Sequence, residues 1–391
     1  MSTRRARRAA ATRSGWDLRF MRIALQLARR GYGMTSPNPM VGAVLVRRGR
    51  VIGRGWHHRA GEPHAEIEAL RDARRRGLAV KGATLYVTLE PCCTQGRTPP
   101  CTDALKSAGI RRVVAGATDP NPRHAGRAFR ILRRTGMAVT RGVLAEECGR
   151  LNEAFNHWIT RRAPFVTVKA GMTLDGKIAT ASGESRWITG EQARAWGMKL
   201  RKGADAILVG VNTVLADDPG LTVRTQKPGA RQAPAMVAGN RLRRIVLDAM
   251  ARTPLSAQVA SDAWAPLTTI VVGKSAPRRR VAALARRVRV LVAPVSRGKV
   301  NLRWLMKQLG AENVTSLLVE GGGEVNASFL LQGLAQRVAF FYAPRILGGR
   351  DSRRAVAGEG AGTLAECLRL TDLEWRRLGA DWLLSARVEV P

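Results

Sequence analysis

The sequence has few aromatic residues, few acidic residues and few cysteines. Phe, Trp and Tyr make up 5% of the 391 residues, and the regular mixture of basic and aromatic residues typical of nucleic-acid-binding surfaces is missing. Charges interrupt every apolar stretch before it reaches the length of a membrane span, so we expect no transmembrane helix. Five cysteines, an odd and sparse set in a long chain, argue against a disulfide scaffold. They favour a reducing compartment, and we predict a cytoplasmic protein.

Positive charge is abundant: 66 Lys and Arg face 29 Asp and Glu, for a net charge of +37. Such a charge occurs in nucleic-acid-binding proteins. Here, however, the basic residues are spread over the whole chain, which favours solvated faces whose field attracts an anionic small substrate. We therefore expect neither a nucleic-acid nor a membrane partner. The first sixteen residues hold five arginines, no acid and no apolar signal-peptide core, so residues 1–15 are predicted to form a flexible basic tail.

The length is comfortable for two domains, and 45% hydrophobic residues can fill two cores. Alternating strand and helix patterns predict the α/β class throughout. In the first half, we expect helices at 16–30, 64–76 and 102–108, and strands at 41–46, 51–55, 84–89 and 113–117. In the second half, we expect strands at 165–170, 206–210, 244–247, 268–272, 288–292, 314–319, 338–342 and 382–390, and helices at 191–202, 301–309 and 324–331. The predicted divisions are a domain over 16–145, a helical connector over 146–163, a domain over 164–391 and an exposed excursion at 224–241.

One cluster of metal-binding residue types stands out, formed by His64, Cys92 and Cys101. Zinc takes imidazole and thiolate ligands, and a catalytic zinc keeps one position for water. Glu66 is close enough in sequence to His64 to exchange protons between that water and a ring nitrogen. Cys92 is expected to open a helix, whose N-terminus favours a thiolate. This order of residues is the signature of zinc nucleobase deaminases, apart from the long gap between the two cysteines.

Three alternatives compete with a catalytic zinc site for a small substrate. A structural zinc site requires a fourth ligand, for which His57, His58 or Cys93 are available. A deaminase acting on nucleic acid, such as a tRNA adenosine deaminase fused to a second module, explains the charge but predicts a Cys-x-x-Cys spacing. A non-catalytic zinc-stabilised protein does not need Glu66.

Seven motifs make the chain resemble the bifunctional riboflavin-biosynthesis deaminase/reductase family. They lie at 36–42 (SPNPMVG), 61–66 (GEPHAE), 90–101 (EPCCTQGRTPPC), 119–122 (DPNP), 169–177 (KAGMTLDGK), 182–190 (SGESRWITG) and 319–323 (VEGGG). The resemblance covers residues 15–390, and the family shares the long gap between the cysteines. It implies a cytidine-deaminase-like three-layer α/β/α domain, then a dihydrofolate-reductase-like α/β domain, in a homo-oligomer.

In the first half, the resemblance implies one zinc ion per site on the three ligands named above, with Glu66 as the catalytic proton shuttle. Zinc hydroxide would attack the ring carbon that bears the exocyclic amine of a phosphorylated diaminopyrimidine, and ammonia would leave. The positions that match the family's substrate pocket are Asn38, His57, Arg97 and Thr98.

In the second half, residues 319–323 follow an apolar strand and precede a helix, where backbone N–H groups can cradle a pyrophosphate. An acid about 20 residues later is missing, so a Rossmann domain is not expected. The resemblance implies an NADPH-dependent reductase that converts the ribosyl group to ribityl. Matching cofactor positions are Gly171, Trp187, Thr213, Asp217, Ala249, Gly322, Gly323, Glu324, Val325, Asn326, Ala327 and Ser328. Matching substrate positions are Ser185, Arg201, Leu221, Arg224 and Glu320, and we predict Asp217 and Lys169 as catalytic polar groups beside the reacting sugar.

Four residues depart from the family pattern. Cys93 and Thr94 stand where the family has Ser-His, and Glu68 stands where a His often follows the shuttle. Ala249 replaces a cofactor-contacting Ser. None of these changes touches a predicted metal ligand, but they leave open the alternative that one half has lost its activity.

Overall fold

The computed structural model describes residues 2–95, 99–224 and 242–389, and it divides into two compact units, Met1–Arg161 and Arg162–Pro391. Each unit has its own sheet and its own hydrophobic cores. Within the described part of the chain, no helix is both long enough and apolar enough to span a lipid bilayer. The predicted excursion lies outside the described residues, except for its first residue, Arg224. The predicted domain boundaries stay predictions.

The first unit contains a five-stranded sheet in the order β2-β1-β3-β4-β5. Strand β1 runs antiparallel to β2 and β3, whereas β3, β4 and β5 are mutually parallel. The strands are β1 (Gly42–Arg47), β2 (Arg50–Trp56), β3 (Thr84–Leu89), β4 (Arg112–Ala117) and β5 (Ala138–Arg141). The helices are α1 (Ser2–Ala28), η1 (Arg29–Gly31), α2 (Ala65–Arg75), α3 (Cys101–Ser107), α4 (Arg127–Arg134), α5 (Ala145–Leu151) and α6 (Glu153–Arg161). Helix α1 begins inside the predicted basic tail, whose flexibility stays a prediction.

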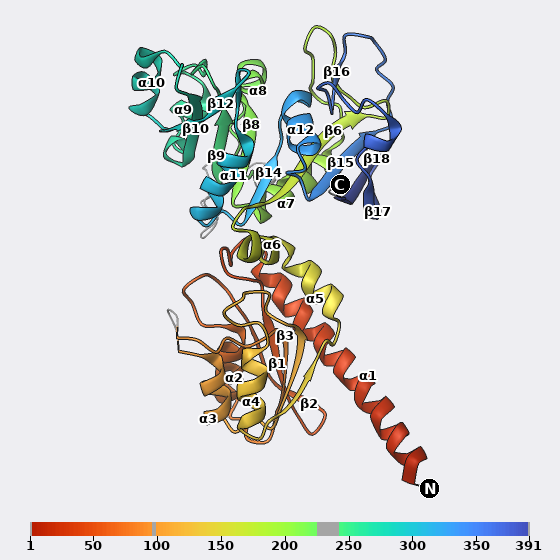
Figure 1. Cartoon of the computed structure of the whole chain (residues 1–391). Helices are drawn as coiled ribbons and strands as arrows, with labels where there is room; N and C mark the ends of the chain where they lie inside the picture. Colours follow the sequence, from red (N-terminus) through yellow and green to blue (C-terminus); the bar gives the residue numbers. More distant parts are fainter. Residues whose placement is uncertain (1, 96–98, 225–241, 390–391) are drawn as a thin grey trace. The chain divides into compact units, whose positions relative to one another are not determined.

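The sheet of the first unit lies between two helical layers. Side chains alternate along a strand, so Ala43 and Leu45 of β1 pack in the core with α2, α3 and α4. Val44 and Val46 pack on the other face, against α1 and Cys148 of α5. Figure 1 shows the same division, with α2, α3 and α4 on one side of the sheet and α1 and α5 on the other. This arrangement is a three-layer α/β/α domain.

Helix α2 lies very close to the backbone of β2. A side-chain carbon on Gly53 or Gly55 would come within 2.3 Å of the carbonyl oxygens of Ala69 and Ala65, respectively. Real side chains do not approach this closely. The two glycines therefore let the beginning of α2 rest directly on the sheet.

The second unit contains a nine-stranded sheet in the order β11-β10-β9-β8-β14-β6-β15-β18-β17. Neighbouring strands from β11 to β15 are parallel, and β18 and β17 add an antiparallel edge. The strands are β6 (Phe165–Thr173), β7 (Lys177–Ala179), β8 (Ala206–Gly210), β9 (Arg243–Leu247), β10 (Thr268–Gly273), β11 (Arg289–Ala293), β12 (Val295–Ser296), β13 (Lys299–Val300), β14 (Ser316–Val319), β15 (Arg337–Ala343), β16 (Arg353–Arg354), β17 (Leu370–Leu378) and β18 (Asp381–Val388). The helices are α7 (Glu191–Gly203), α8 (Val211–Asp217), α9 (Gln258–Ser261), η2 (Ala265–Leu267), α10 (Arg278–Ala285), α11 (Leu302–Ala311), α12 (Gly323–Leu331) and η3 (Leu364–Glu366).

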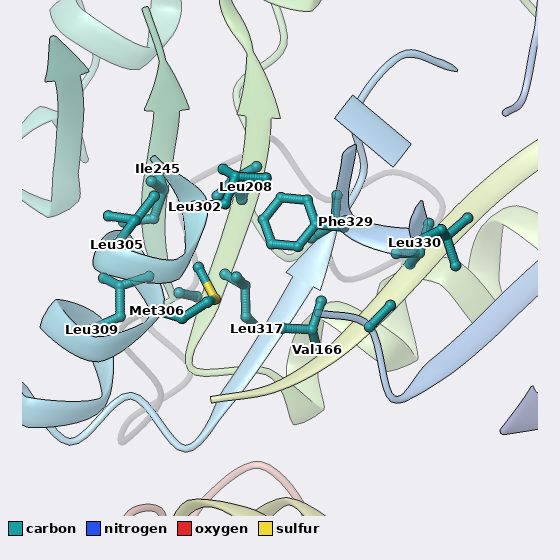
Figure 2. Packing of buried hydrophobic residues seen from close by; sticks show 14 of the residues in the cluster. Val166, Leu208, Ile245, Leu302, Leu305, Met306, Leu309, Leu317, Phe329 and Leu330 are labelled. Carbon is teal, nitrogen blue, oxygen red and sulfur yellow. The ribbon is translucent and has the colours of Figure 1, made fainter. Parts of the chain in front are cut away.

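Two hydrophobic cores cover the two faces of this sheet. Ile245 of β9 points into the core that α11 and α12 close, where Leu305 and Phe329 are buried (Figure 2). The next residue, Val246, points into the opposite core, with Val259 of α9. Because both faces are covered, the parallel strands are almost continuously apolar, which is why their positions could be predicted from the sequence.

Candidate functional site

The first unit brings the three predicted metal ligands together. His64 immediately precedes α2, Cys92 lies in the segment after β3, and Cys101 is the first residue of α3. The His64 Nδ1 atom lies 3.3 Å from the Cys101 Sγ and 3.4 Å from the Cys92 Sγ. The three ligand atoms all lie within 4.8 Å of one another, and no other group of this kind occurs among the described residues. One imidazole and two thiols at this spacing fit a zinc ion.

The prediction that Cys92 opens a helix is wrong, because α3 begins at Cys101 instead. Pro99 and Pro100 lie just before the helix, and Pro100 is its N-cap, where the fixed φ of proline is tolerated. This helix still contacts Cys92: the backbone N–H of Cys101, its first residue, donates a hydrogen bond to the Cys92 Sγ at 3.3 Å. Hydrogen bonds from Cys101 and the neighbouring His64 lower the pKa of the Cys92 thiol and favour the thiolate.

Glu66 lies in the first turn of α2, beside this group, and only 3% of the residue is exposed. Burial, together with the negative charge of Cys92, raises the pKa of its carboxyl to about 7, and His64 opposes this shift. A carboxyl group with such a pKa both accepts and donates a proton at neutral pH, as a general acid and base requires.

Two predicted pocket residues, Asn38 and His57, form a hydrogen-bonded pair. The Asn38 Nδ2 lies 3.1 Å from the His57 Nε2, and the His57 Nδ1 lies 3.1 Å from the carbonyl oxygen of Pro63. Pro63 directly precedes His64, and the two histidine rings meet edge to face at 5.3 Å. His57 thus has both ring nitrogens engaged and fixes the direction of the Asn38 amide beside the metal-binding group.

The three residues proposed as a fourth ligand contact other partners. His57 is engaged as described, His58 stacks on Trp56, and the Cys93 Sγ lies 3.6 Å from the His124 Nδ1. Within residues 2–95, 99–224 and 242–389, the metal-binding group therefore has the three ligands expected of a catalytic site with a position left for water. The predicted substrate residues Arg97 and Thr98 lie outside the described residues.

Glu90, which precedes Pro91 and Cys92, was not among the predicted site residues. This buried carboxylate accepts hydrogen bonds from the backbone N–H groups of Asp119, Gly126 and Ala128, at 3.2, 2.8 and 2.9 Å. It ties the segment that carries Cys92 to the loop before α4. The signal available in the sequence was the motif at 119–122, whose loop this carboxylate holds.

In the second unit, several of the predicted reductase residues lie near or just beyond the carboxyl ends of β8, β14 and β6, which are neighbours in the sheet. Ligands of parallel α/β sheets bind at this edge. Gly321 and Gly323 are closely packed, since a side-chain carbon would lie 2.6 Å from the Val325 Cβ and 2.3 Å from the Arg354 carbonyl oxygen, respectively. Gly322 has open space beside it, with only the Thr213 hydroxyl at 4.0 Å. The first N–H groups of α12 lack partners within the helix, so this open turn fits the phosphate of a nicotinamide cofactor.

Glu320 joins two predicted site residues in one ion cluster. Its Oε1 and Oε2 accept from the Arg201 Nε and Nη2, both at 2.9 Å, and its Oε2 lies 3.5 Å from the Lys169 Nζ. Burial alone would raise the pKa of the Glu320 carboxyl, but Arg201 and Lys169 outweigh it and lower the pKa to about 2. The Glu320 carboxylate is therefore ionised throughout the physiological range.

Asp217, at the end of α8, belongs to a neighbouring set of contacts. Its carboxylate accepts from the Ser185 hydroxyl at 3.2 Å, and its carbonyl oxygen accepts from the Arg186 Nη2 at 2.5 Å. Burial and the positive charges of Arg201 and Arg186 lower the pKa of the Arg224 guanidinium, and Glu320 opposes this shift. Such neighbouring guanidinium groups are suited to an anionic ligand.

The remaining predicted positions lie on several different elements of the second unit. Gly171 of β6 faces Thr189, and the ring of Trp187 is exposed beneath the Arg194 guanidinium at 4.6 Å. Asn326 is buried, and its Nδ2 donates to the carbonyl oxygen of Ala355. Leu221 is buried in the core on the α9 side, and Ala249 follows the end of β9. The other α12 positions are placed by the helix itself: Glu324, Val325, Ala327 and Ser328.

Sequence profiles of two known families match the two units. The profile described as the cytidine and deoxycytidylate deaminase zinc-binding region matches residues 14–117. The profile described as the RibD C-terminal domain matches residues 164–384. Together, they imply zinc and a nicotinamide cofactor, and they confirm the predicted fold class of each half.

Full-length relatives are similar to nearly the whole chain. The riboflavin biosynthesis protein RibD of Actinobacillus pleuropneumoniae is 42% identical over 375 residues, which cover 96% of this chain and 96% of that protein. RibD of Escherichia coli is 42% identical over 371 residues, covering 93% and 97%. Among solved structures, Acinetobacter baumannii RibD has a TM-score of 0.83 at 34% identity, covering 96% of this chain and all of that chain.

A deaminase/reductase structure from Thermotoga maritima is also similar, with a TM-score of 0.81 and 32% identity over 96% of this chain and all of that chain. The second domain is part of the similarity in each case, so the alternative of a tRNA deaminase fused to an unrelated module is not favoured. The resemblance inferred from the motifs is confirmed by these matches. This chain belongs to the RibD family and is a bifunctional deaminase and reductase of riboflavin biosynthesis.

Proposed function

We propose that the first unit removes an amine from a diaminohydroxyphosphoribosylaminopyrimidine and that the second unit reduces the ribosyl group of the resulting 5-amino-6-(5-phosphoribosylamino)uracil with NADPH. The similar T. maritima structure is that of a diaminohydroxyphosphoribosylaminopyrimidine deaminase and 5-amino-6-(5-phosphoribosylamino)uracil reductase. The observation that carries the proposal is the convergence of His64, Cys92 and Cys101 beside a buried Glu66. A merely structural zinc site has no use for such a carboxyl group.

In the deaminase half, His64, Cys92 and Cys101 would hold the zinc ion. When bound, zinc supplies a Lewis acid that lowers the pKa of a coordinated water to about 7. Glu66 accepts one proton from the attacking water and passes it to a ring nitrogen. It then accepts a second proton from the added hydroxyl group and passes it to the amine, which leaves as ammonia. The Asn38 amide, held by His57, binds and orients the pyrimidine. Asn38 and His57 hold the substrate in place and do not need to gain or lose a proton.

In the reductase half, the turn at Gly322 and the residues that follow, through Ser328, would hold the cofactor, which supplies a hydride when bound. Arg201 and Arg224 bind the substrate phosphate and ribose region, as guanidinium groups do. Lys169, held by Glu320, places its Nζ beside the reacting sugar. Asp217, whose carboxylate accepts a hydrogen bond from the Ser185 hydroxyl, lies beside the same sugar.

The whole proposal is tested by adding the diaminopyrimidine ribosyl phosphate and NADPH to the purified protein and following ammonia release and NADPH oxidation together. We expect equimolar ammonia and oxidised cofactor, because the second step consumes the product of the first. Ammonia release without NADPH oxidation would show that the reductase half is inactive, as the Ala249 departure allows. Failure of both reactions would contradict the proposal.

Removing the metal is expected to separate the two activities. Dialysis against a zinc chelator should reduce ammonia release to background, since the coordinated water is lost, while reduction of the already deaminated pyrimidine continues. Added zinc should restore deamination, and elemental analysis should find one zinc ion per chain. Full deamination by a preparation free of metal would rule out the proposed centre.

A small phosphorylated pyrimidine as the partner, a cytoplasmic location and a homo-oligomeric state are part of the same proposal. No nucleic acid is expected to bind, since the cations described in the reductase half serve small anionic ligands and internal contacts.

A further inference from the structure

The loop from Asp217 to Arg224 carries three of the predicted reductase residues: Asp217, Leu221 and Arg224. It follows α8 directly and contains two non-glycine residues with a left-handed backbone, Asp218 at φ 38° and Leu221 at φ 49°. Such residues disfavour this region, because the Cβ atom crowds the backbone. The loop therefore does not take this shape by itself, and the surrounding structure must hold it.

Three arginines hold the loop, and each donates to a different carbonyl oxygen. Arg186 binds the carbonyl oxygen of Asp217, Arg244 binds that of Gly220 at 2.8 Å, and Arg201 binds that of Thr222 at 2.9 Å. Arg201 is a predicted substrate residue, and Arg186 stands in the sequence between two other predicted site residues, Ser185 and Trp187. Arg244 comes from β9 and approaches the loop from the core side of the sheet.

Arg244 is the most completely engaged of these three side chains. Only 1% of it is exposed, and its Nη1 and Nη2 form a fork on the two carboxylate oxygens of Asp262, both at 2.7 Å. Its Nε donates to the Thr268 hydroxyl at 2.8 Å and its Nη2 to the carbonyl oxygen of Val259 at 3.2 Å. With Gly220 as the fifth acceptor, every nitrogen of the guanidinium is fixed in direction.

Burying this charged side chain costs free energy that an apolar core residue would not cost. Burying a charged pair requires desolvating both partners, and well-packed hydrophobic residues often serve stability equally well. Arg244 lies in a strand whose neighbours are apolar, so the core alone does not explain a guanidinium here. The five hydrogen bonds explain the guanidinium, because only arginine can reach a carboxylate, a hydroxyl and two carbonyl groups in one plane.

We propose that Arg244 is a positioning residue of the reductase site: it holds the Gly220 carbonyl and thereby sets the places of Leu221 and Arg224. It touches neither substrate nor cofactor. This inference rests on the proposed reductase function and extends it to a residue that lies behind the site.

The test compares Arg244→Lys with Arg243→Lys, a matched control in the same strand. The Arg243 guanidinium pairs with Glu312, which follows α11 and lies outside the loop. In Arg244→Lys, one ammonium cannot reach all the acceptors, so the loop moves. We expect the KM for the pyrimidine in NADPH-dependent reduction to rise about tenfold or more, as small misplacements of binding groups do. The KM for NADPH and the rate of ammonia release should match those of the control.

Hydrogen exchange of the loop amides provides a second measurement that needs no substrate. Exchange over 217–224 should be faster in Arg244→Lys than in Arg243→Lys. If Arg244→Lys does not fold, Asp262→Asn keeps the guanidinium but loses the negative charge and one of the two acceptor oxygens of the fork, and it must show the same effects at smaller size. Equal KM values and equal exchange in the two lysine variants would overturn the proposal. A wild-type protein that oxidises no NADPH would instead contradict the proposed function, while the exchange comparison would still decide the role of Arg244.

Discussion

Glu66→Gln is expected to lower the kcat for ammonia release by a factor of about 10² to 10⁴, the usual contribution of a positioned general acid and base. The amide keeps the size of the side chain and fills the same buried position in α2, but it cannot carry a proton between water and the ring. Zinc content should not change, because Glu66 is not one of the three converging ligands. Steady-state ammonia release and elemental analysis of the same preparation measure both quantities.

A matched control lies one half-turn further along the same helix. The Glu68 carboxylate accepts from the Arg71 guanidinium at 2.9 Å at the surface of α2. Glu68→Gln makes the same chemical change without touching the metal-binding group, so it should retain the turnover of the wild type. If Glu66→Gln retains zinc and turns over as fast as Glu68→Gln, the proton-shuttle role is wrong.

Glu320→Gln is expected to abolish NADPH oxidation and to destabilise the second unit. The substitution leaves the buried Arg201 guanidinium and the Lys169 ammonium close together without a counter-ion. Breaking a buried ion pair in this way costs about 3–5 kcal/mol of unfolding free energy. Because both cations would also move, we expect reductase activity to fall by at least about a hundredfold. Denaturant unfolding and NADPH oxidation measure the two effects.

Glu312→Gln provides the control for Glu320→Gln. Glu312 also joins two arginines, Arg243 and Arg289, and they lower the pKa of its carboxyl to about 2, but the site is partly exposed. Exposed pairs contribute about 0–1 kcal/mol, so this variant should be nearly as stable as the wild type and fully active. Equal losses in both variants would mean that the Glu320 cluster has no special role in the reaction.

The sign of the pH dependence follows from the depressed pKa of Glu320. In the unfolded chain its carboxyl titrates near 4.5, whereas in the folded chain the pKa is about 2. The pair therefore stabilises the fold fully above pH 4.5, and this contribution disappears as the pH falls towards 2. Glu320→Gln should lack this part of the acid dependence, which a comparison of unfolding curves over that range would show.

The sequence was sufficient to predict the metal-binding group, because a histidine and two cysteines offer ligand atoms that few other residue types provide. It was also sufficient for the buried parallel strands, whose apolar runs are long and uninterrupted. It did not reveal β17, since all but the two end residues of that edge strand are exposed and its sequence is mixed in charge. It also missed α4 and β5, which are short and follow a loop that Glu90 fastens from a distance.

The roles of individual arginines could not be predicted from the sequence. Arg201 was expected to contact a phosphate, and the structure shows that it also holds Glu320 and the carbonyl oxygen of Thr222. Arg244 was included only as part of a strand, although it is among the most deeply buried side chains of the chain. In a sequence with so many basic residues, only the fold distinguishes a guanidinium that crosses a core from one that faces solvent.

The geometry of the metal-binding group depends in part on two glycines, Gly53 and Gly55, which have no side chain. His64 and Glu66 stand at the start of α2, and that end of the helix touches the sheet through Gly55, with Gly53 beneath the following turn. A single added methyl group at Gly55 would lift the helix away from the sheet and carry the imidazole away from both sulfur atoms. A loss of deamination can therefore originate in a residue that performs no chemistry and binds nothing. A search for functional positions confined to polar side chains would overlook it.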